Sequence, residues 1–244
     1  MSKLHKGKTC AYCSLPGASQ TGDHVLARSM VAEPLRGEIP VVPACAACNN
    51  KKVDLEHYAA SIIPFGGRHA GASARLVADV PKRLAKNQRL HRELAAGQTQ
   101  VWSVEAGLMV PCLAIPIDGK RIERLVDYIA RGLMFHHWGI ALGSDCIVDV
   151  LSLTRHGEGF FDRHLALNAR QRASGDIGQG ALRYRGAQAV DNPQISFWVM
   201  SLYGGLKTEG DDRMTSTKFG VMTGPVTVRE RASRAAEKGL LLPS

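Results

Sequence analysis

The sequence predicts an α+β fold in which a small cysteine-rich module precedes a larger mixed domain with antiparallel strands. Three observations indicate this. Four of the six cysteines form two C-x-x-C pairs near the N-terminus. A helical pattern of apolar residues follows Asp118, and strand-like runs separated by Gly, Asp and Asn turns fill the C-terminal part. No internal repeat is present, which excludes a repeat architecture.

The composition is that of an ordinary globular chain. Its 244 residues are 45% apolar and 22% charged, with 25 Gly and 11 Pro, which excludes a disordered or fibrous protein. Residues 101–117 are the most apolar stretch, but Glu105, Pro111 and Pro116 interrupt them, so no membrane span is predicted. The basic N-terminus lacks the apolar segment of a secretory signal, and we expect a cytoplasmic protein.

Breaks in the pattern predict three parts. Pro64, Gly66 and Gly67 should end a helix that starts at Asn49 and runs to about Ser61, which places a boundary near residue 64. We therefore expect a cysteine-rich module, then a basic helical connector, then a mixed α+β domain of unknown role, over residues 1–64, 65–99 and 100–244.

Local signals predict the individual elements. Pro81 suits the first turn of a helix over residues 82–95, which Gly97 can end. Asp118 should cap a helix that runs to about Trp138, and Gly139 should end it. The core-facing stripe of that helix is Ile122, Leu125, Val126, Ile129, Leu133 and Met134. Strands are expected over residues 23–27, 39–42, 100–117, 180–190, 194–203 and 213–222, and a closing helix over residues 230–238.

The net charge of +9 indicates a polyanionic partner. Residues 61–100 hold seven Lys or Arg against Asp79 and Glu93. On the expected second helix Lys82, Lys86 and Arg89 share one face. The residues expected to contact nucleic acid are Lys51, Lys52, Lys82, Arg83, Lys86 and Arg89. The alternative is that the basic helix simply presents a solvated face.

The paired cysteines predict a structural zinc ion. Two C-x-x-C knuckles, Cys10 with Cys13 and Cys45 with Cys48, supply the four thiolates of a closed tetrahedral shell. In a reducing compartment such spacing is typical of metal binding and not of disulfides. The alternative is four reduced, unliganded thiols. The remaining cysteines, Cys112 and Cys146, are expected to be small buried apolar residues.

Three further residues around the knuckles carry groups suited to catalysis. Asp23 and Asn49 offer hard oxygen donors of the kind that magnesium or manganese accepts. His24 can be neutral at cellular pH and take a proton from water. An Asp-His pair on its own is also common in turns and on surfaces.

Together these residues resemble the HNH endonucleases. The resemblance is carried by Cys10-x-x-Cys13, by Gly22-Asp23-His24-Val25, and by the run from Val42 to Lys52 that contains Cys45, Cys48 and Asn49. It is closest in pattern to the zinc-stabilised branch of the family, which includes phage endonuclease VII. It covers about residues 8–62.

The resemblance implies a ββα-metal finger, treble-clef-like in form, in which a strand presents the histidine and the next helix supplies the last metal ligand. It implies that His24 is the general base, that Asp23 and Asn49 hold a catalytic magnesium or manganese ion, and that the cysteines hold zinc. One position departs from the family. Its middle asparagine has no match in residues 33–44, and Pro40 stands near the place where it would be expected.

Strand geometry adds one requirement. Neighbouring residues on a regular strand point to opposite faces, so Asp23 and His24 can serve one site only if the strand ends or bulges there, with Gly22 as the suggested point of distortion. On the following helix Asn49, Lys52 or Val53, and Glu56 share a face. Glu56 is expected to pair with Lys52, or else to assist the metal.

The favoured hypothesis is an HNH-type endonuclease that cleaves DNA by single-metal, histidine general-base hydrolysis. The alternatives are a non-catalytic zinc-finger module that binds nucleic acid, and an interaction protein in which zinc only stabilises the fold. Elsewhere, the pair His136-His137 beside Trp138 is expected to pack. Arg183-Tyr184-Arg185 is expected to form a surface ladder or, alternatively, to stack on a base.

Overall fold

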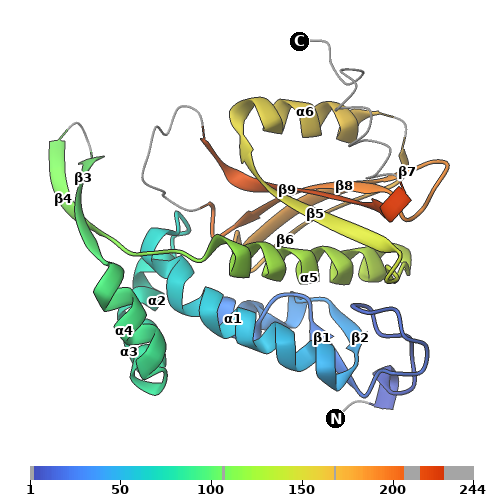
Figure 1. Ribbon diagram of the computed structural model, residues 1–244, viewed down its shortest axis with the longest axis horizontal. Helices are drawn as coiled ribbons and strands as arrows, with labels where there is room; N and C mark the ends of the chain where they lie inside the picture. Colours follow the sequence, from blue (N-terminus) through green and yellow to red (C-terminus); the bar gives the residue numbers. More distant parts are fainter. Residues whose placement is uncertain (1–2, 106–107, 168, 206–214, 228–244) are drawn as a thin grey trace.

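The computed structural model describes residues 3–105, 108–167, 169–205 and 215–227. These residues form stacked layers (Figure 1). An N-terminal hairpin and its helix lie on one side of a long central helix, a five-stranded sheet lies on the other side, and an outer helix covers the far face of that sheet. The strands pair antiparallel throughout the described part of the chain. The expected α+β class is therefore confirmed.

The N-terminal layer pairs two short strands with one long helix. β1 (Thr21–His24) and β2 (Val41–Ala44) are antiparallel, with Thr21 opposite Ala44 and His24 opposite Val41. Three 3-10 turns flank and link them: η1 (Lys3–His5), η2 (Arg28–Met30) and η3 (Glu33–Glu38). β1 starts two residues and ends three residues before its expected bounds, and β2 lies two residues after its expected bounds, because the cross-strand pairing and not the β-propensity sets the ends.

The helix α1 (Ala46–Gly66) starts earlier and ends later than expected. Cys45 is its N-cap, and Gly67 is its C-cap. Pro64 lies inside the last turn, where its missing N–H removes only one hydrogen bond, while the neighbouring Ile62 and Ile63 stay buried. The break expected at Pro64 therefore falls at Gly67.

Three short helices form the basic connector: α2 (Ala72–Ala78), α3 (Val80–Lys86) and α4 (Gln88–Gly97). The single helix expected over residues 82–95 was wrong, because the chain leaves the helical conformation at Asn87. The Asn87 side chain then accepts a hydrogen bond from the Leu90 N–H and caps α4. Gly97 ends α4 as expected, and α2 was not expected.

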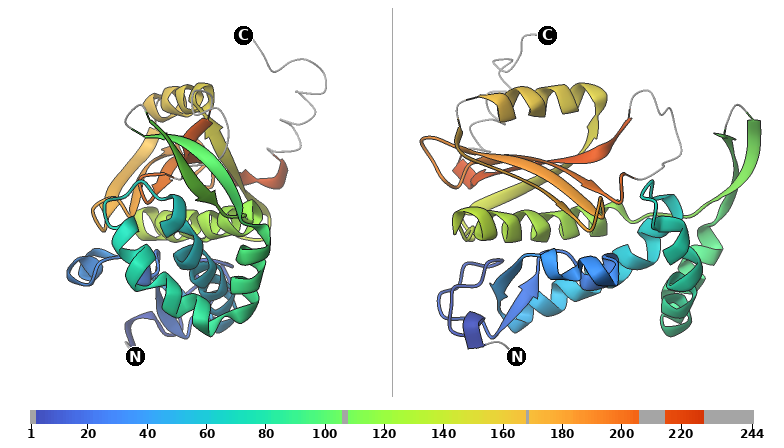
Figure 2. Two further views of the ribbon diagram at one scale, coloured as in Figure 1. Left: turned by 90° about the vertical axis from the view of Figure 1, so that its left-hand side faces the viewer. Right: turned by 180° about the vertical axis from the view of Figure 1, so that it is seen from behind.

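A two-stranded hairpin follows the connector and projects from the body of the molecule (Figures 1 and 2). It consists of β3 (Thr99–Glu105) and β4 (Leu108–Ala114), which pair in regular register with Trp102 opposite Pro111. The irregular strands expected here are thus one regular hairpin. Trp102 is 62% exposed.

The central helix α5 (Gly119–Trp138) matches its expectation closely. The Asp118 side chain accepts a hydrogen bond from the Arg121 N–H at 3.2 Å, and Gly139 ends the helix with φ 69°. The whole expected stripe is buried: Ile122, Leu125, Val126, Ile129, Leu133 and Met134.

The C-terminal sheet has the strand order β5-β9-β8-β7-β6. Its strands are β5 (Cys146–Thr154), β6 (Ala169–Ile177), β7 (Leu182–Ala189), β8 (Ser196–Leu202) and β9 (Thr215–Pro225). Strands β7, β8 and β9 were expected. The sequence did not indicate β5, β6 or the outer helix α6 (Arg155–Ala166), because β5 and β6 lie at the sheet edges and expose most of their side chains at least partly.

One apolar core joins the N-terminal layer to the sheet through α5. The layers approach closely at Gly132, where a Cβ atom would lie 3.0 Å from Val25 Cγ2. A smaller cluster, containing Phe161 and Val199, lies under α6.

The boundaries expected near residues 64 and 99 stay a prediction. The larger apolar core continues across the first of them. The helix expected over residues 230–238 lies outside the described residues. Within those residues, no helix has both the length and the apolar character needed to span a bilayer.

Candidate functional site

The four paired cysteines come together at the N-terminal end of α1. Their sulfur atoms all lie within 4.8 Å of one another, and Cys13 Sγ is 3.8 Å from Cys45 Sγ. Thiolates bound to a tetrahedral zinc at ~2.3 Å would lie ~3.8 Å apart. Among the described residues this is the one group of three or more His, Cys, Asp or Glu side chains placed to hold a metal ion. The arrangement fits a metal ion such as zinc.

Local backbone geometry builds this cluster. In the first knuckle the Ser14 N–H donates to the Cys10 carbonyl, and Ser14 adopts φ 57°, which turns the chain back on itself. In the second knuckle Cys45 caps α1, and its sulfur accepts from the Cys48 N–H. The Cys45 N–H donates in turn to Cys10 Sγ, which ties the two knuckles together.

The electrostatics of the cluster favour a bound cation. Burial acts to raise the pKa of Cys10, but hydrogen bonds from backbone N–H groups, that of Cys45 first, outweigh it and the pKa is lowered. Burial, followed by the neighbouring Cys45 and Cys10, raises the pKa of Cys48 far above its usual range. Four thiolates at this spacing repel one another, so full deprotonation requires a positive charge between them.

β1 carries the two predicted catalytic residues at its end. Asp23 pairs with Val42 and His24 with Val41 without any register shift, so the suggested bulge at Gly22 is absent from this hairpin. The strand instead ends at His24, which is the other of the two expected arrangements. Gly22 has a packing role, because a Cβ atom there would lie 2.6 Å from the His5 ring.

Asp23 is held in the interior by two other segments. Asp23 is only 9% exposed. The Tyr12 hydroxyl donates to Asp23 Oδ2 at 2.5 Å, and Lys52 Nζ lies 3.0 Å from the same oxygen. Burial and then the charge of Asp23 raise the pKa of Tyr12, so the hydroxyl keeps its proton and remains a donor. Among the described residues the other oxygen, Oδ1, has no hydrogen-bond donor.

Lys52 also contacts Glu56, one turn further along α1, in the expected pair. Burial raises the pKa of Glu56, and the ammonium of Lys52 opposes that shift. Lys52 is fully buried. It therefore lies away from the surface where a phosphate contact was expected, because its ammonium is used inside the fold.

His24 is half-buried, and its ring makes no hydrogen bond within the described part of the chain. Burial and then the nearby Arg28 lower the pKa of His24, while Asp23 acts in the opposite direction. The ring is consequently neutral at neutral pH, as a general base requires. Asn49 lies in the first turn of α1 and is half-buried, and its side-chain amide likewise has no partner among the described residues.

The other basic residues of the prediction lie at or near the surface. Lys51, Lys82, Lys86 and Arg89 are exposed, and Arg83 is half-buried. Because the chain breaks at Asn87, Arg89 belongs to α4 and the two lysines to α3, so these residues do not share one continuous helix face as expected. Arg89 also pairs with Glu93 at 3.0 Å.

The histidine pair beside Trp138 and the Arg183-Tyr184-Arg185 run make contacts within the fold. His137 contacts the Tyr184 hydroxyl at 2.9 Å, and Trp138 lies against Trp198 with ring centroids 4.8 Å apart. Arg183 and Arg185 pair with Asp176 and Asp162. Tyr184 is buried, which excludes the stacking alternative for this ring.

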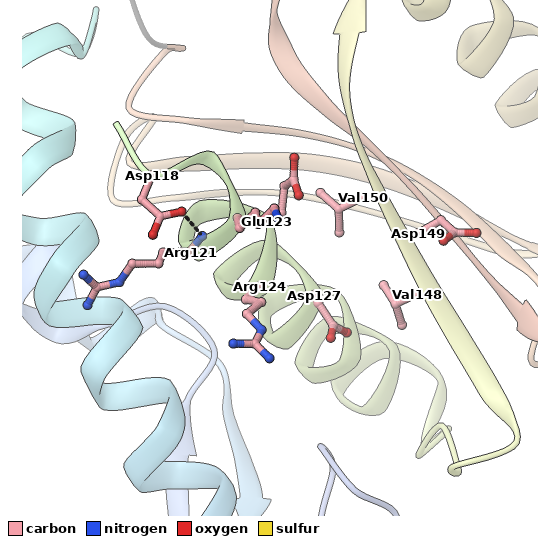
Figure 3. Close-up of a pocket in the computed structure, with 9 residues that line it drawn as sticks. Asp118, Arg121, Glu123, Arg124, Asp127, Val148, Asp149 and Val150 are labelled. Carbon is pink, nitrogen blue, oxygen red and sulfur yellow. Dashed lines mark hydrogen bonds between the residues drawn. The ribbon is translucent and has the colours of Figure 1, made fainter. Parts of the chain in front are cut away.

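A polar pocket of about 710 Å³ lies between α5 and β5 (Figure 3). Its wall includes Asp118, Arg121 and Asp127, each of which already has a structural partner. Asp118 caps α5, Arg121 lies over the Tyr58 ring at 4.0 Å, and Asp127 pairs with Arg131. Three of the charged side chains that line the pocket therefore already have structural roles.

Sequence reasoning missed Tyr12 and Arg28, which contact or influence Asp23 and His24. Tyr12 stands between the first two cysteines, and its position inside a knuckle was the one available signal.

Comparison of the chain with protein-family models, with curated proteins and with solved structures gives no match.

Proposed function

We propose that this chain is an HNH-type endonuclease that hydrolyses phosphodiester bonds in DNA, with His24 as the general base. The observation that carries the proposal is a pattern of unpaired groups. The His24 ring, the Asn49 amide and Asp23 Oδ1 have no hydrogen-bond partner within the described part of the chain, although their neighbours Tyr12 and Lys52 are paired. Polar groups that the fold itself does not use, at the junction of a hairpin and a helix, are available to a substrate.

The thiolate cluster supports the proposal by joining β2 to α1. Cys45 directly follows β2 and caps the helix that carries Asn49, while β2 pairs with the strand that carries His24. A bound zinc would hold these positions and take no part in bond breaking. Placement matters, because an error of about 1 Å can cost on the order of 100-fold in rate. In this proposal the module is the treble-clef-like ββα-metal finger of the family.

The proposed reaction is in-line hydrolysis. The neutral His24 imidazole takes a proton from a water molecule, the water oxygen attacks phosphorus, and the bond to the leaving oxygen breaks. Asp23 Oδ1 and the Asn49 amide oxygen are hard donors suited to magnesium or manganese, which keeps several waters in its shell. When bound, such an ion would supply positive charge to the phosphate in the transition state.

The test is a cleavage assay on supercoiled plasmid with magnesium or manganese. We expect nicking or cutting by the wild-type protein. His24→Ala should lower the rate by about 10²–10⁴-fold while zinc stays bound. His57→Ala is the matched control, because His57 is an exposed histidine of the neighbouring helix α1 and has no proposed role. Equal cleavage by His24→Ala and the wild-type protein would refute the assignment.

A second candidate, a non-catalytic zinc-finger module that binds nucleic acid, is favoured by one observation. Lys52 and Tyr12 already use Oδ2 of Asp23, which leaves a single carboxylate oxygen for a cation. This candidate predicts DNA affinity that falls steeply with salt and no divalent-dependent cleavage. Replacing Lys82 and Lys86 by Gln should reduce the salt dependence under either proposal, so cleavage alone decides between them.

A further inference from the structure

The most unusual side chain in the hairpin–helix junction is Lys52. It is 0% exposed, and burial of an ammonium group is costly unless all its donors are used. Three oxygens surround it: the His24 carbonyl at 2.7 Å, Asp23 Oδ2 at 3.0 Å, and Glu56 Oε1. The contacts with the His24 carbonyl and with Glu56 are hydrogen bonds, and the contact with Asp23 is an ion pair, so the charge of Lys52 is compensated inside the fold.

Two of the three acceptors belong to the residues proposed for catalysis. Lys52 reaches from α1 to the end of β1 and binds the side chain of Asp23 and the main chain of His24. Tyr12, from the first cysteine knuckle, binds the same Asp23 oxygen from another segment. Oδ2 is therefore fixed from two directions, and Oδ1 is left free among the described residues.

Stability alone is a poor explanation for a charge in this position. Apolar side chains in place of Lys52, Asp23 and Glu56 together would carry no desolvation cost, and replacing a buried ion cluster as a whole by apolar side chains is often neutral or stabilising. An ammonium group differs from a methyl group in that it fixes the direction of its acceptors. The charge thus provides orientation that packing would not provide.

We infer that Lys52 is a positioning residue of the proposed active site: it fixes Asp23 through Oδ2 and His24 through its carbonyl, so that Oδ1 and the imidazole stay oriented for reaction. This inference rests on the proposed nuclease function. It assigns Lys52 no contact with substrate, in keeping with its complete burial.

The first test is single-turnover cleavage by Lys52→Met, which removes the charge and shortens the unbranched side chain by only one atom. We expect the rate of the chemical step to fall by about 100-fold, with DNA affinity and zinc content unchanged. Glu56→Gln is the matched control, because it alters the acceptor of Lys52 that lies outside β1. Its single-turnover rate should fall by less than about fivefold. A Lys52→Met rate equal to that of the wild-type protein would overturn the inference.

Chemical rescue separates positioning from folding. Lys52→Ala leaves a cavity that ethylammonium can enter. Added ethylammonium should raise the cleavage rate of this variant at least about tenfold. Lys52→Met has no such cavity and should not respond. Rescue of both variants, or of neither, would contradict the inference. If Lys52→Ala fails to fold, the comparison of Lys52→Met with Glu56→Gln still decides.

A readout that needs no activity completes the test. Amide hydrogen exchange over residues 21–26 should be faster in Lys52→Met than in the wild-type protein and in Glu56→Gln, because the end of β1 loses its anchor. Unchanged exchange would overturn the inference even for an active nuclease. Faster exchange in a protein whose wild-type form cleaves no DNA would instead refute the proposed function and leave Lys52 as an anchor of β1.

Discussion

The two sides of α5 are held together by different interactions. On one side, the N-terminal layer relies on four closely spaced thiols and on the buried ion pairs of Lys52. On the other side, the sheet relies on apolar packing around Trp198, and its polar groups are paired, as in the bond between Ser196 and Thr223. A few strong local bonds can fix a small layer and still leave neighbouring polar groups unpaired. The predictions below test this difference, from the largest effect to the smallest.

Removing the proposed zinc ion should have the largest effect. Structural zinc contributes about 10–16 kcal/mol to the folding of finger peptides, so a strong chelator or Cys45→Ser should unfold the N-terminal layer. Circular dichroism and thermal melts with and without chelator measure this. Cys112→Ser is the control, because Cys112 lies on β4 outside the cluster. A metal-free protein that melts within a few degrees of the untreated protein would show that the layer holds together without thiolate ligation.

The next effect concerns the sheet. Trp198 is fully buried, and its Nε1 donates to Ser196 Oγ at 2.8 Å. Trp198→Ala should lower the free energy of unfolding by about 3–5 kcal/mol, while the folded protein keeps its zinc. Urea melts and metal analysis check the two statements separately. Trp102→Ala, on the exposed hairpin, should change stability by less than about 0.5 kcal/mol. Loss of zinc from folded Trp198→Ala would contradict the proposed separation.

A smaller effect is expected at the shared helix. Asp118 caps α5 through the Arg121 N–H, and Asp118→Ala should cost about 1 kcal/mol. Because α5 packs on both sides, the loss should appear in one cooperative urea transition. Asp54→Ala, an exposed substitution inside α1, serves as control. Two separate transitions in Asp118→Ala would mean that the layers unfold independently.

The smallest effect is a pH dependence from His137. Burial and then the nearby His136 lower the pKa of His137. The unfolded chain therefore binds a proton more readily than the folded one, so the contribution of His137 is complete above about pH 6.5 and is lost as the pH falls through the folded pKa. The loss of stability between about pH 7.5 and about pH 5 should be smaller in His137→Gln. Identical pH profiles for the variant and the wild-type protein would contradict this.

The sequence could predict the elements that have strong local signals. The cysteine spacing indicated the four-cysteine cluster, and the cap at Asp118, the glycine at 139 and the apolar stripe between them indicated α5. The pairing of Lys52 with Glu56 followed from their spacing on a helix. These features depend on residues close in sequence or on a fixed coordination geometry, so a pattern alone is sufficient to find them.

Features set by distant contacts could not be predicted. Lys52 was expected at the surface, because nothing in its neighbourhood along the chain shows that Asp23 and the carbonyl of His24, which is 28 residues away, enclose its ammonium. The edge strands β5 and β6 have mixed exposure and give no alternating pattern. Asn87 carried a real capping signal, but the helical residues on both sides of it concealed the break. The assignment of Asp23, His24 and Asn49 to catalysis remains a prediction.

The contact between Gly132 and Val25 limits how this protein can be divided. At this point the central helix has no side chain, and the turn after β1 fits directly against its backbone. A fragment ending after α1 would expose that matching surface to water and lose its support. Grafting the cysteine module onto another protein should therefore require α5 as well, and the smallest transferable unit is the hairpin together with both helices.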